Sequence, residues 1–442
     1  MNAEPLMLIE KCRILGVLDD GVASLGQSAL AHLAHAQLVI GGARTLQLLA
    51  AHIAPDAQQR DLTGAMSQVP EWIRCAQADG LRVVVLATGD PLCHGIAAYL
   101  ASRLCIEAIE VIPNVSTLQL ACARLCLPWQ DMKFASVHSK DAGDWLAGSE
   151  PSHVLYGLLR DIRQHDRLAV LTSPFNTPDR IARMLVTEGL ADEYEMAVAE
   201  CLCQPQERIV SGFSIRAATQ MPFAELNVVL LWRTTLRTPQ VLFGLPDASY
   251  AQRYPEKGLI TKNEVRAVSL ARMQLRLSSV VWDIGAGSGS VGLEAARLCR
   301  MGHVYAIEKN GDDCLNVLQN RLAMGISNHT LLHGKAPEGL QDWADPDAVF
   351  IGGSGGELTE LIELILQRLN PDGWLVMNFV TLENLNVALE TVKALGANWD
   401  VLQLQASRSK PILHMNRMVA ENPVWIVCAQ AGTVPEAGTQ ND

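Results

Sequence analysis

The sequence has no long apolar run. Its 442 residues include no uninterrupted stretch of about 18 apolar residues, the length that a membrane-spanning helix requires. The first residues, MNAEPLMLIEKCRIL, also lack a basic segment followed by a long apolar one, which is the pattern of a secretory signal. We therefore expect no membrane partner and a cytoplasmic protein.

Positive charge is scarce as well. The sequence has 35 Lys and Arg residues against 47 Asp and Glu residues, which gives a formal net charge of −12. A domain that binds nucleic acid normally presents a basic face, so this balance predicts no nucleic-acid partner. It does not exclude an anionic small molecule, because a few Arg and Lys side chains can gather locally on an acidic protein.

Metal-binding spacings are also missing. The 11 cysteines are scattered, and they form neither a C-x-x-C pair nor a paired Cys/His group of the kind that binds zinc. We expect reduced, mostly buried thiols and no metal site.

Strand-like and helical patterns alternate along the whole sequence, which predicts an α/β fold with largely parallel sheets. A segment with three prolines and two glycines, residues 233–258, places a domain boundary near residue 240. Two lobes in the first half would face each other across a cleft. The predicted parts are a first domain at 1–238 with lobes of about 1–115 and 116–238, a second domain at 245–430, and a flexible tail at 431–442.

The most informative stretch is VVWDIGAGSGSVGLEAARL at residues 280–298. It begins as a strand to Ile284, turns at Gly285, Gly287 and Gly289, and continues with apolar residues at helical spacing. Further strands are predicted at HVYAIE, DAVFIGG, PDGWLVMNFV, DVLQLQAS and PVWIVCAQ. Together they predict a doubly wound sheet, whose ligand binds beyond the carboxyl ends of the strands.

A helix is predicted between the strands HVYAIE and DAVFIGG, in DDCLNVLQNRLAMGI. Leu315, Leu318 and Leu322 recur there at helical spacing, and we expect them to form its apolar face.

Two kinds of ligand suit a glycine loop. The substring GSGSVG satisfies the dinucleotide pattern G-x-G-x-x-G, and Glu308 at the end of the next strand would suit the ribose of either ligand. Asp283 distinguishes the two, because a carboxylate beside the turn repels a pyrophosphate but suits an ammonium and a sulfonium. The pattern therefore favours S-adenosylmethionine over a dinucleotide, and a binding fold without chemistry is a further alternative. The backbone N–H groups of the loop would donate to the carboxylate of S-adenosylmethionine. The residues of this loop are Gly285, Ala286, Gly287, Ser288 and Gly289.

The stretch Phe350–Gly356, FIGGSGG, indicates what kind of molecule accepts the methyl group. Amino-group methyltransferases often carry an Asn/Asp-Pro-Pro-aromatic turn at this place, whereas this chain presents a wall of backbone. A bulky acceptor that is methylated at carbon fits such a wall better.

Residues 245–430 resemble a known family. ITKNEVRA, VVWDIGAGSGSVGLEAARL, HVYAIEKN, GKAPEGL, DAVFIGGSGG and ENPVWIV follow one another as in the decarboxylating, carbon-15-methylating enzymes of corrin biosynthesis. This resemblance implies a Rossmann-like class I fold that binds S-adenosylmethionine.

The first 235 residues resemble the tetrapyrrole methylases, particularly their carbon-5-methylating corrin member. The matching stretches are VIGGARTLQLL, VVVLATGDPLCHGIAAYL, VIPNVSTLQLACARLCLPW and ELNVVLL. A chain with both parts is similar to the fused methyltransferases of cobalamin biosynthesis, which methylate carbons 5 and 15 of precorrin-6B, remove the ring C acetate carboxyl and give precorrin-8. A fusion that acts on another tetrapyrrole, and a non-catalytic module that binds the donor, are the alternatives.

The resemblance also implies site residues. In the second domain they are Thr261, Asp283, the loop from Gly285 to Gly289, Glu308, Lys335 and Ala336, and in the first domain they are Gly89, Asp90, Pro91, Ser116 and Thr117. An anionic tetrapyrrole would be held by cations at the rim of its groove, for which the candidates are Lys262, Arg266, Arg408, Lys410 and Arg417. Lys262, Arg266 and His414 are the predicted catalytic residues, with His414 as a proton donor for decarboxylation. We also expect a homo-oligomer.

The chain departs from the family pattern in three places. In the family the first strand is followed by a G-x-G turn. In this chain Gly16 is followed by VLDDG, which ends at Gly21. Cys203 and Gln204 replace a double glycine, and Lys335 replaces an acidic residue. These departures bear on donor binding in both domains.

Overall fold

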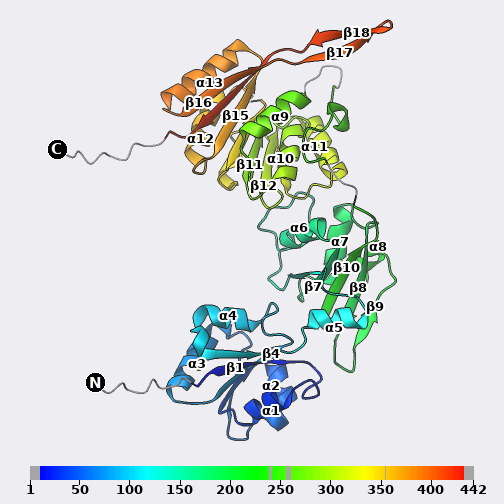
Figure 1. The fold of residues 1–442 in the computed structure, drawn as a ribbon, viewed down its shortest axis with the longest axis vertical. Coiled ribbons are helices and arrows are strands. Elements are labelled where there is room, and N and C mark those ends of the chain that lie inside the picture. Colours follow the sequence, from blue (N-terminus) through cyan, green and yellow to red (C-terminus); the bar gives the residue numbers. More distant parts are fainter. Residues whose placement is uncertain (1–9, 238–240, 255–259, 354, 433–442) are drawn as a thin grey trace, which may run out of the picture. The chain divides into compact units, whose positions relative to one another are not determined.

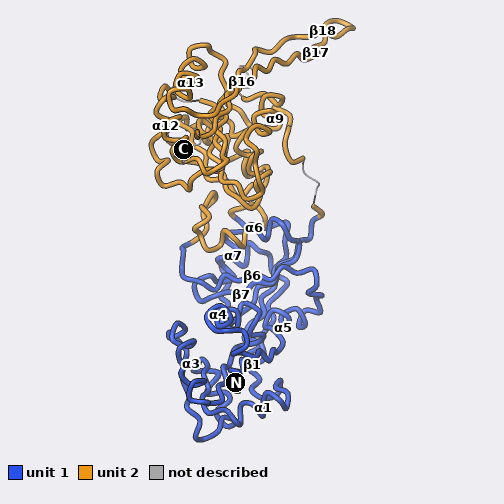
Figure 2. Tube along the Cα trace, turned by 60° about the vertical axis from the view of Figure 1, so that its left-hand side comes forward, with its two compact units in different colours: residues 1–143, 161–186, 191–235 blue, residues 144–160, 187–190, 236–442 orange. Residues whose placement is uncertain are grey.

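The computed structural model describes residues 10–237, 241–254, 260–353 and 355–432 (Figure 1). Two compact units divide these residues (Figure 2). The first unit takes 1–143, 161–186 and 191–235 and the second takes 144–160, 187–190 and 236–442. Most of the predicted flexible tail, from residue 433, lies outside the described residues.

The first unit contains a five-stranded parallel sheet in the order β3-β2-β4-β1-β5. Its middle strands are mostly apolar, because both faces of the sheet are buried: Val83 and Val85 of β4 pack on one side, and Val84 and Leu86 on the other. The strands are β1 (Cys12–Val17), β2 (Leu38–Gly41), β3 (Gln58–Asp61), β4 (Val83–Thr88) and β5 (Ile109–Ile112). The helices are α1 (Gln27–Ala34), α2 (Ala43–Leu49), α3 (Val69–Ala78) and α4 (Ile96–Arg103).

A second sheet of the first unit is mixed, in the order β6-β7-β10-β8-β9. β6 and β7 are parallel, whereas β10 runs antiparallel to both β7 and β8. β6 is the first strand of this lobe along the chain, and it lies at one edge of the sheet. Its strands are β6 (Lys133–Ser136), β7 (Arg167–Leu171), β8 (Tyr194–Glu200), β9 (Arg208–Val210) and β10 (Asn227–Arg233), and its helices are α5 (Thr117–Arg124), α6 (Tyr156–Gln164), α7 (Pro178–Thr187) and α8 (Ile215–Ala218).

The second unit contains a seven-stranded sheet in the order β13-β12-β11-β14-β15-β19-β16. Five strands are parallel, and β19 is antiparallel to both of its neighbours. The predicted doubly wound α/β fold is thereby confirmed. The strands are β11 (Val280–Ile284), β12 (His303–Glu308), β13 (His329–His333), β14 (Ala348–Ile351), β15 (Trp374–Phe379), β16 (Asn398–Leu404) and β19 (Val424–Gln430), and the helices are α9 (Asn263–Arg272), α10 (Ser290–Leu298), α11 (Gly311–Ala323), α12 (Leu358–Arg368) and α13 (Leu382–Ala394).

A separate two-stranded hairpin, β17 (Ser407–Ile412) and β18 (Met415–Ala420), extends between β16 and β19 (Figure 1). The sequence analysis did not identify it, because its polar and apolar residues do not alternate clearly.

The predicted apolar face of α11 is wrong. Leu315, Leu318 and Leu322 are 66%, 42% and 52% exposed. The opposite face is the buried one, and it includes Val317 and Arg321. Helical spacing shows that residues share a face, but it does not show which face meets the sheet.

Arg321 explains part of this outcome. Its guanidinium donates to Glu188 at 3.1 Å, and both side chains are almost fully buried. Glu188 also accepts from the indole N–H of Trp145 at 3.0 Å. The segments 144–160 and 187–190 therefore form part of the core of the second unit.

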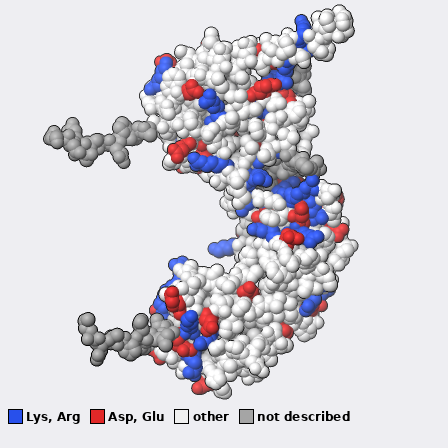
Figure 3. All heavy atoms as spheres, viewed as in Figure 1, with Lys and Arg blue, Asp and Glu red and all other residues white. Residues whose placement is uncertain are grey.

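No helix among the described residues is long and apolar enough to cross a membrane. All 11 cysteines are free, but only five are buried, which is fewer than the mostly buried set that the sequence predicts. On the face shown in Figure 3, acidic and basic side chains occur in both compact units.

Candidate active site

The glycine loop between β11 and α10 follows the predicted pattern closely. Gly285, Gly287 and Gly289 have φ angles of +72°, +57° and +76°, which glycine adopts with little strain. A Cβ atom on Gly285 would lie 2.5 Å from the carbonyl oxygen of Gly353. The loop can therefore press its backbone against the end of β14 only with glycine at this position.

Hydrogen bonds hold the loop from two sides. The N–H groups of Gly285 and Ala286 donate to the carbonyl of Ile307 at 3.0 and 3.1 Å. Gly287 N–H donates to Glu308 Oε2 at 2.8 Å, and Ser288 O accepts from Asn320 Nδ2 at 2.9 Å. Gly289 is the N-cap of α10, so the loop ends at the positive end of a helix dipole.

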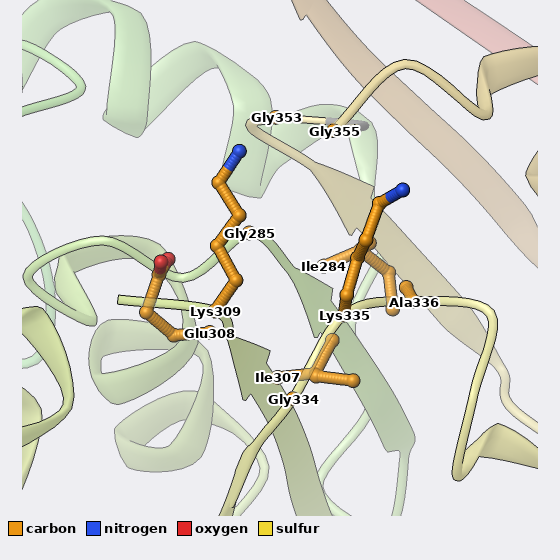
Figure 4. A pocket seen from close by; sticks show the side chains of 10 residues that line it. All are labelled: Ile284, Gly285, Ile307, Glu308, Lys309, Gly334, Lys335, Ala336, Gly353 and Gly355. Carbon is orange, nitrogen blue, oxygen red and sulfur yellow. The ribbon is translucent and has the colours of Figure 1, made fainter. Parts of the chain in front are cut away.

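A pocket opens at the carboxyl ends of β11, β12 and β14 (Figure 4). In Figure 4 the side chains of Lys309 and Lys335 rise from either side of it toward the loop of Gly353 and Gly355. The lining residues are Ile284, Gly285, Ile307, Glu308, Lys309, Gly334, Lys335, Ala336, Gly353 and Gly355. Their position is the one expected for the ligand of a doubly wound sheet.

Four predicted cofactor-binding residues line this pocket: Gly285, Glu308, Lys335 and Ala336. The Lys335 ammonium lies 2.5 Å from Glu357 Oε1, so the cation that departs from the family pattern has an acidic neighbour. The sequence analysis did not single out Ile284, Ile307 and Lys309. Their place at or just after the ends of two parallel strands could have identified them.

The pocket offers hydrogen-bond acceptors to a ligand with hydroxyl groups. Each carboxylate oxygen of Glu308 accepts one backbone N–H, from Gly287 at 2.8 Å and from Asn310 at 2.9 Å. Each oxygen keeps a lone pair that can accept from a ribose hydroxyl. A Cβ on Gly287 would meet nothing within 4 Å, so the space beside the loop is open.

Asp283 does not lie where the sequence analysis expected it. Its side chain is buried and absent from the pocket lining, with Oδ2 accepting the Gly292 N–H at 2.9 Å. Oδ1 has no hydrogen-bond partner among the residues that the structure describes. Burial raises the pKa of Asp283 to about 7, against the lowering effect of that N–H, and the charge of Glu308 adds to the rise. Asp283 therefore hydrogen-bonds to the first turn of α10 and does not line the pocket. The prediction that its carboxylate faces the donor is wrong.

Arg266 is not a rim cation. Its side chain is completely buried, and Nε donates to Glu294 Oε1 at 2.9 Å. Nη1 donates to the carbonyl of Thr261 at 2.6 Å and to Asp247 at 3.2 Å. A guanidinium with these partners cannot reach a substrate, so the predicted catalytic role of Arg266 is wrong and its role is to hold the chain before α9.

Thr261 and Lys262 stand at the start of α9, with Lys262 as its N-cap residue. The Lys262 ammonium lies 3.9 Å from Asp247 Oδ2 and is partly exposed. Neither residue lines the pocket, so their roles stay predictions.

The other predicted cations and His414 belong to the hairpin. His414 lies in its exposed turn, and Lys410 stands opposite Arg417 across the two strands. Arg408 pairs with Glu264 of α9 at 2.5 Å. None of these residues lines the pocket, because the hairpin extends away from the sheet.

In the first unit the structure brings together the two predicted donor-binding stretches. Gly89 has a φ of +67°, and a Cβ there would lie 3.3 Å from both Ser116 Cα and Thr117 N. Asp90 Oδ1 accepts the Leu92 N–H at 2.9 Å, and Pro91 lies in the same turn. Ser116 caps α5 through a capping box, so its hydroxyl has a structural partner.

Comparisons with known proteins agree with this arrangement. The chain matches the family models of the precorrin methyltransferase domain over residues 252–430 and of the tetrapyrrole (corrin/porphyrin) methylases over residues 14–214. The fold and these matches define a methyltransferase with two modules.

A precorrin-6Y C(5,15)-methyltransferase (decarboxylating) of Sinorhizobium sp is 30% identical over 430 residues, which are 96% of this chain and 97% of the relative. A cobalt-precorrin-6B C(15)-methyltransferase (decarboxylating) of Salmonella typhimurium is 40% identical over 172 residues, 39% of this chain and 88% of the relative. A solved precorrin-6y C5,15-methyltransferase from Geobacter metallireducens is 39% identical and covers 43% of this chain and 97% of its own, with a TM-score of 0.41. The chain belongs to the family of decarboxylating precorrin-6Y C(5,15)-methyltransferases. The family resemblance stated above is thereby confirmed.

Proposed function

We propose that the chain uses S-adenosylmethionine to methylate carbons 5 and 15 of precorrin-6B and removes the ring C acetate carboxyl, giving precorrin-8. Residues 1–238 would methylate carbon 5, and residues 245–430 would methylate carbon 15 and decarboxylate. The observation that carries this proposal is the pocket of the second unit, where a glycine loop and Glu308 meet at the strand ends.

The residues of the pocket suggest how the donor is held. Glu308 would accept from the ribose hydroxyls, and the start of α10 would favour the donor's carboxylate. Lys335 and Ala336 line the same pocket and would contact the adenine. When bound, S-adenosylmethionine supplies an electrophilic methyl group on a positively charged sulfur.

The chain's own contribution is orientation. A reduced tetrapyrrole offers an electron-rich carbon, so methyl transfer needs no strong side-chain base. Holding the two reactants in line can contribute about 7–11 kcal/mol. The backbone of Gly353 and Gly355 forms one wall of the pocket, which leaves room for a bulky acceptor. A weakly polar wall also favours a reaction in which positive charge disperses.

The acceptor carries several carboxylates, so cations near the pocket should bind it. Lys309 is the candidate in the pocket itself, and Lys262 is the candidate beside α9. His414 as a proton donor, self-association, the absence of a nucleic-acid partner and a cytoplasmic location stay predictions.

The mass of the product tests the proposal. Purified protein is incubated with precorrin-6B and S-adenosylmethionine, and the product should have gained two methyl groups and lost one carboxyl group. A product without these changes, from a protein that binds the donor, would indicate another tetrapyrrole substrate or a non-catalytic module. Binding of a nicotinamide dinucleotide over Gly285 in place of the donor would overturn the assignment of the site.

A further inference from the structure

Asp19 connects parts of the first unit that are far apart in sequence. It lies in the turn after β1, and its side chain is 17% exposed. Gln204 Nε2 donates to Asp19 Oδ2 at 2.6 Å across a sequence separation of 185 residues. Arg44 Nη1 lies 2.9 Å from the same oxygen. One carboxylate oxygen therefore joins the turn after β1, the start of α2 and the loop between β8 and β9.

These contacts link the two sheets of the first unit. Asp19 follows β1 of the parallel sheet, whereas Gln204 follows β8 of the mixed sheet. Both residues also belong to stretches where the chain departs from the family pattern. Two departures that are unrelated in sequence thus meet in one hydrogen bond.

The turn that carries Asp19 adjoins the predicted donor site. Val17 O accepts the Gly89 N–H at 2.7 Å. A Cβ on Gly16 would lie 2.2 Å from Gly89 O and 2.6 Å from Asn114 N. Because the backbone is packed this closely, a shift of the turn after β1 would move the Gly89 turn as well.

The loop that carries Gln204 is strained. Cys201 and Cys203 have φ angles of +49° and +64°, a left-handed conformation that is unfavourable for a residue with a side chain. Such a conformation persists where surrounding contacts determine it. Glu207 supplies two of these contacts, accepting the Cys203 N–H at 2.6 Å and pairing with Arg124 at 2.5 Å.

Arg124 ends α5, the helix that begins at Thr117 beside Ser116. The strained loop is therefore tied to the Ser116 stretch through α5 and to the Gly89 stretch through Asp19. The loop is thus connected to both stretches that are predicted to bind the donor.

We propose that Asp19 and Gln204 are a positioning pair for methyl transfer at carbon 5. By holding the loop Cys201–Glu207 against the turn after β1, they fix the distance between the Gly89 turn and the start of α5. The inference rests on the proposed function of the first unit, and it assigns the pair no contact with either reactant.

Gln204→Glu tests the pair most directly, because it places a second carboxylate against Asp19. We expect the KM for S-adenosylmethionine in carbon-5 methylation to rise about tenfold, with kcat changed less than about threefold. Adding Asp19→Asn to Gln204→Glu restores one donor and one acceptor with their roles exchanged. This double variant should return KM to within about threefold of the native value. Gln220→Glu adds the same charge at an exposed position after α8 and should change neither parameter.

Two readouts separate positioning from general stability. Calorimetry on the full chain should show weaker donor binding at one site and unchanged binding at the other, which serves as an internal control. The midpoint of thermal unfolding should not follow the KM values across the native chain and the three variants. If Gln204→Glu leaves both sites unchanged, or if Asp19→Asn fails to rescue it, the inference is wrong. If the native chain binds donor at both sites but gives no carbon-5 product, the proposed function fails while the binding data still decide on the pair.

Discussion

The two predicted donor sites differ in how their backbone is arranged. In the second unit, the glycine loop leaves open space beside Gly287, and the Glu308 carboxylate has lone pairs to offer. In the first unit, the corresponding backbone is closely packed, because Gly16 lies against Gly89. The Ser116 side chain caps its own helix. The second unit builds its site at the strand ends of one sheet and the helices beside them, whereas the first depends on contacts between two sheets.

This difference explains why a local pattern described one site better than the other. The loop of the second unit is continuous in sequence from Asp283 to Ser290, so its glycine pattern can be read from one stretch, although Ile307, Glu308 and Gly353 also fix its position. The site of the first unit is assembled from three separated stretches, which include Gly16, Gly89 and Ser116. Single changes in the two units should therefore separate the two reactions.

The largest effect is expected for Gly285→Ala. Its Cβ would lie 2.5 Å from Gly353 O and 2.9 Å from Gly353 N, at a φ that disfavours any side chain. Because displacement by about 1 Å can cost about 100-fold, we expect carbon-15 methylation and CO₂ release to fall by that factor. Gly396→Ala is the matched control, since its φ of +64° is also positive, its Cβ meets no described atom within 4 Å, and it does not line the pocket. Equal losses in the two variants would contradict the close approach to Gly353.

Gly16→Ala should produce the complementary loss. The new Cβ would lie 2.2 Å from Gly89 O, so the Gly89 turn must shift. We expect carbon-5 methylation to fall about 50-fold, while donor binding in the second unit is unchanged. Product mass and calorimetry measure the two effects. Loss of donor binding at both sites would show that the substitution unfolds the chain.

Glu308→Gln should have a smaller effect. The amide oxygen can still accept one backbone N–H, but the amide nitrogen cannot accept the other, so Gly287 or Asn310 loses its partner. We expect donor affinity at one of two sites to fall about tenfold. Glu338→Gln, on the partly exposed segment that follows Ala336, is the control. Unchanged affinity would show that Glu308 does not face the donor.

A further difference concerns stability and its dependence on pH, and not activity. The carboxyl of Asp283 has a pKa of about 7 when folded, against 3.8 as its ordinary value. Between these values the folded state binds a proton that the unfolded state has lost, so the free energy of unfolding should fall as pH rises from about 4 to about 7. Asp283→Asn should reduce this dependence, and exposed Asp56→Asn should not. Denaturant unfolding at several pH values measures the slope. An unchanged slope in Asp283→Asn would show that its proton is not coupled to folding.

The sequence predicted the second unit's sheet well, because buried parallel strands are continuous apolar runs with glycine turns at their ends. It did not reveal β13, whose residues 329–333 are polar at both ends and half-buried. It also assigned Arg266 to the surface, since charge alone does not show that Glu294, Asp247 and Thr261 surround it. Asp283 was misplaced for a similar reason: its position after a strand was correct, but its orientation depends on Gly292. Contacts between residues distant in sequence decide such cases.

The ion pair between Glu188 and Arg321 has a consequence for producing the two halves of the chain as separate fragments. A carboxy-terminal fragment that starts near residue 240 would keep the guanidinium and lose the carboxylate from the earlier half. Removing one partner of a buried pair costs about 3–5 kcal/mol. Such a fragment should therefore have a lower free energy of unfolding than the same domain in the intact chain. A stable fragment would therefore need either a substitution of Arg321 or the segments 144–160 and 187–190 as well.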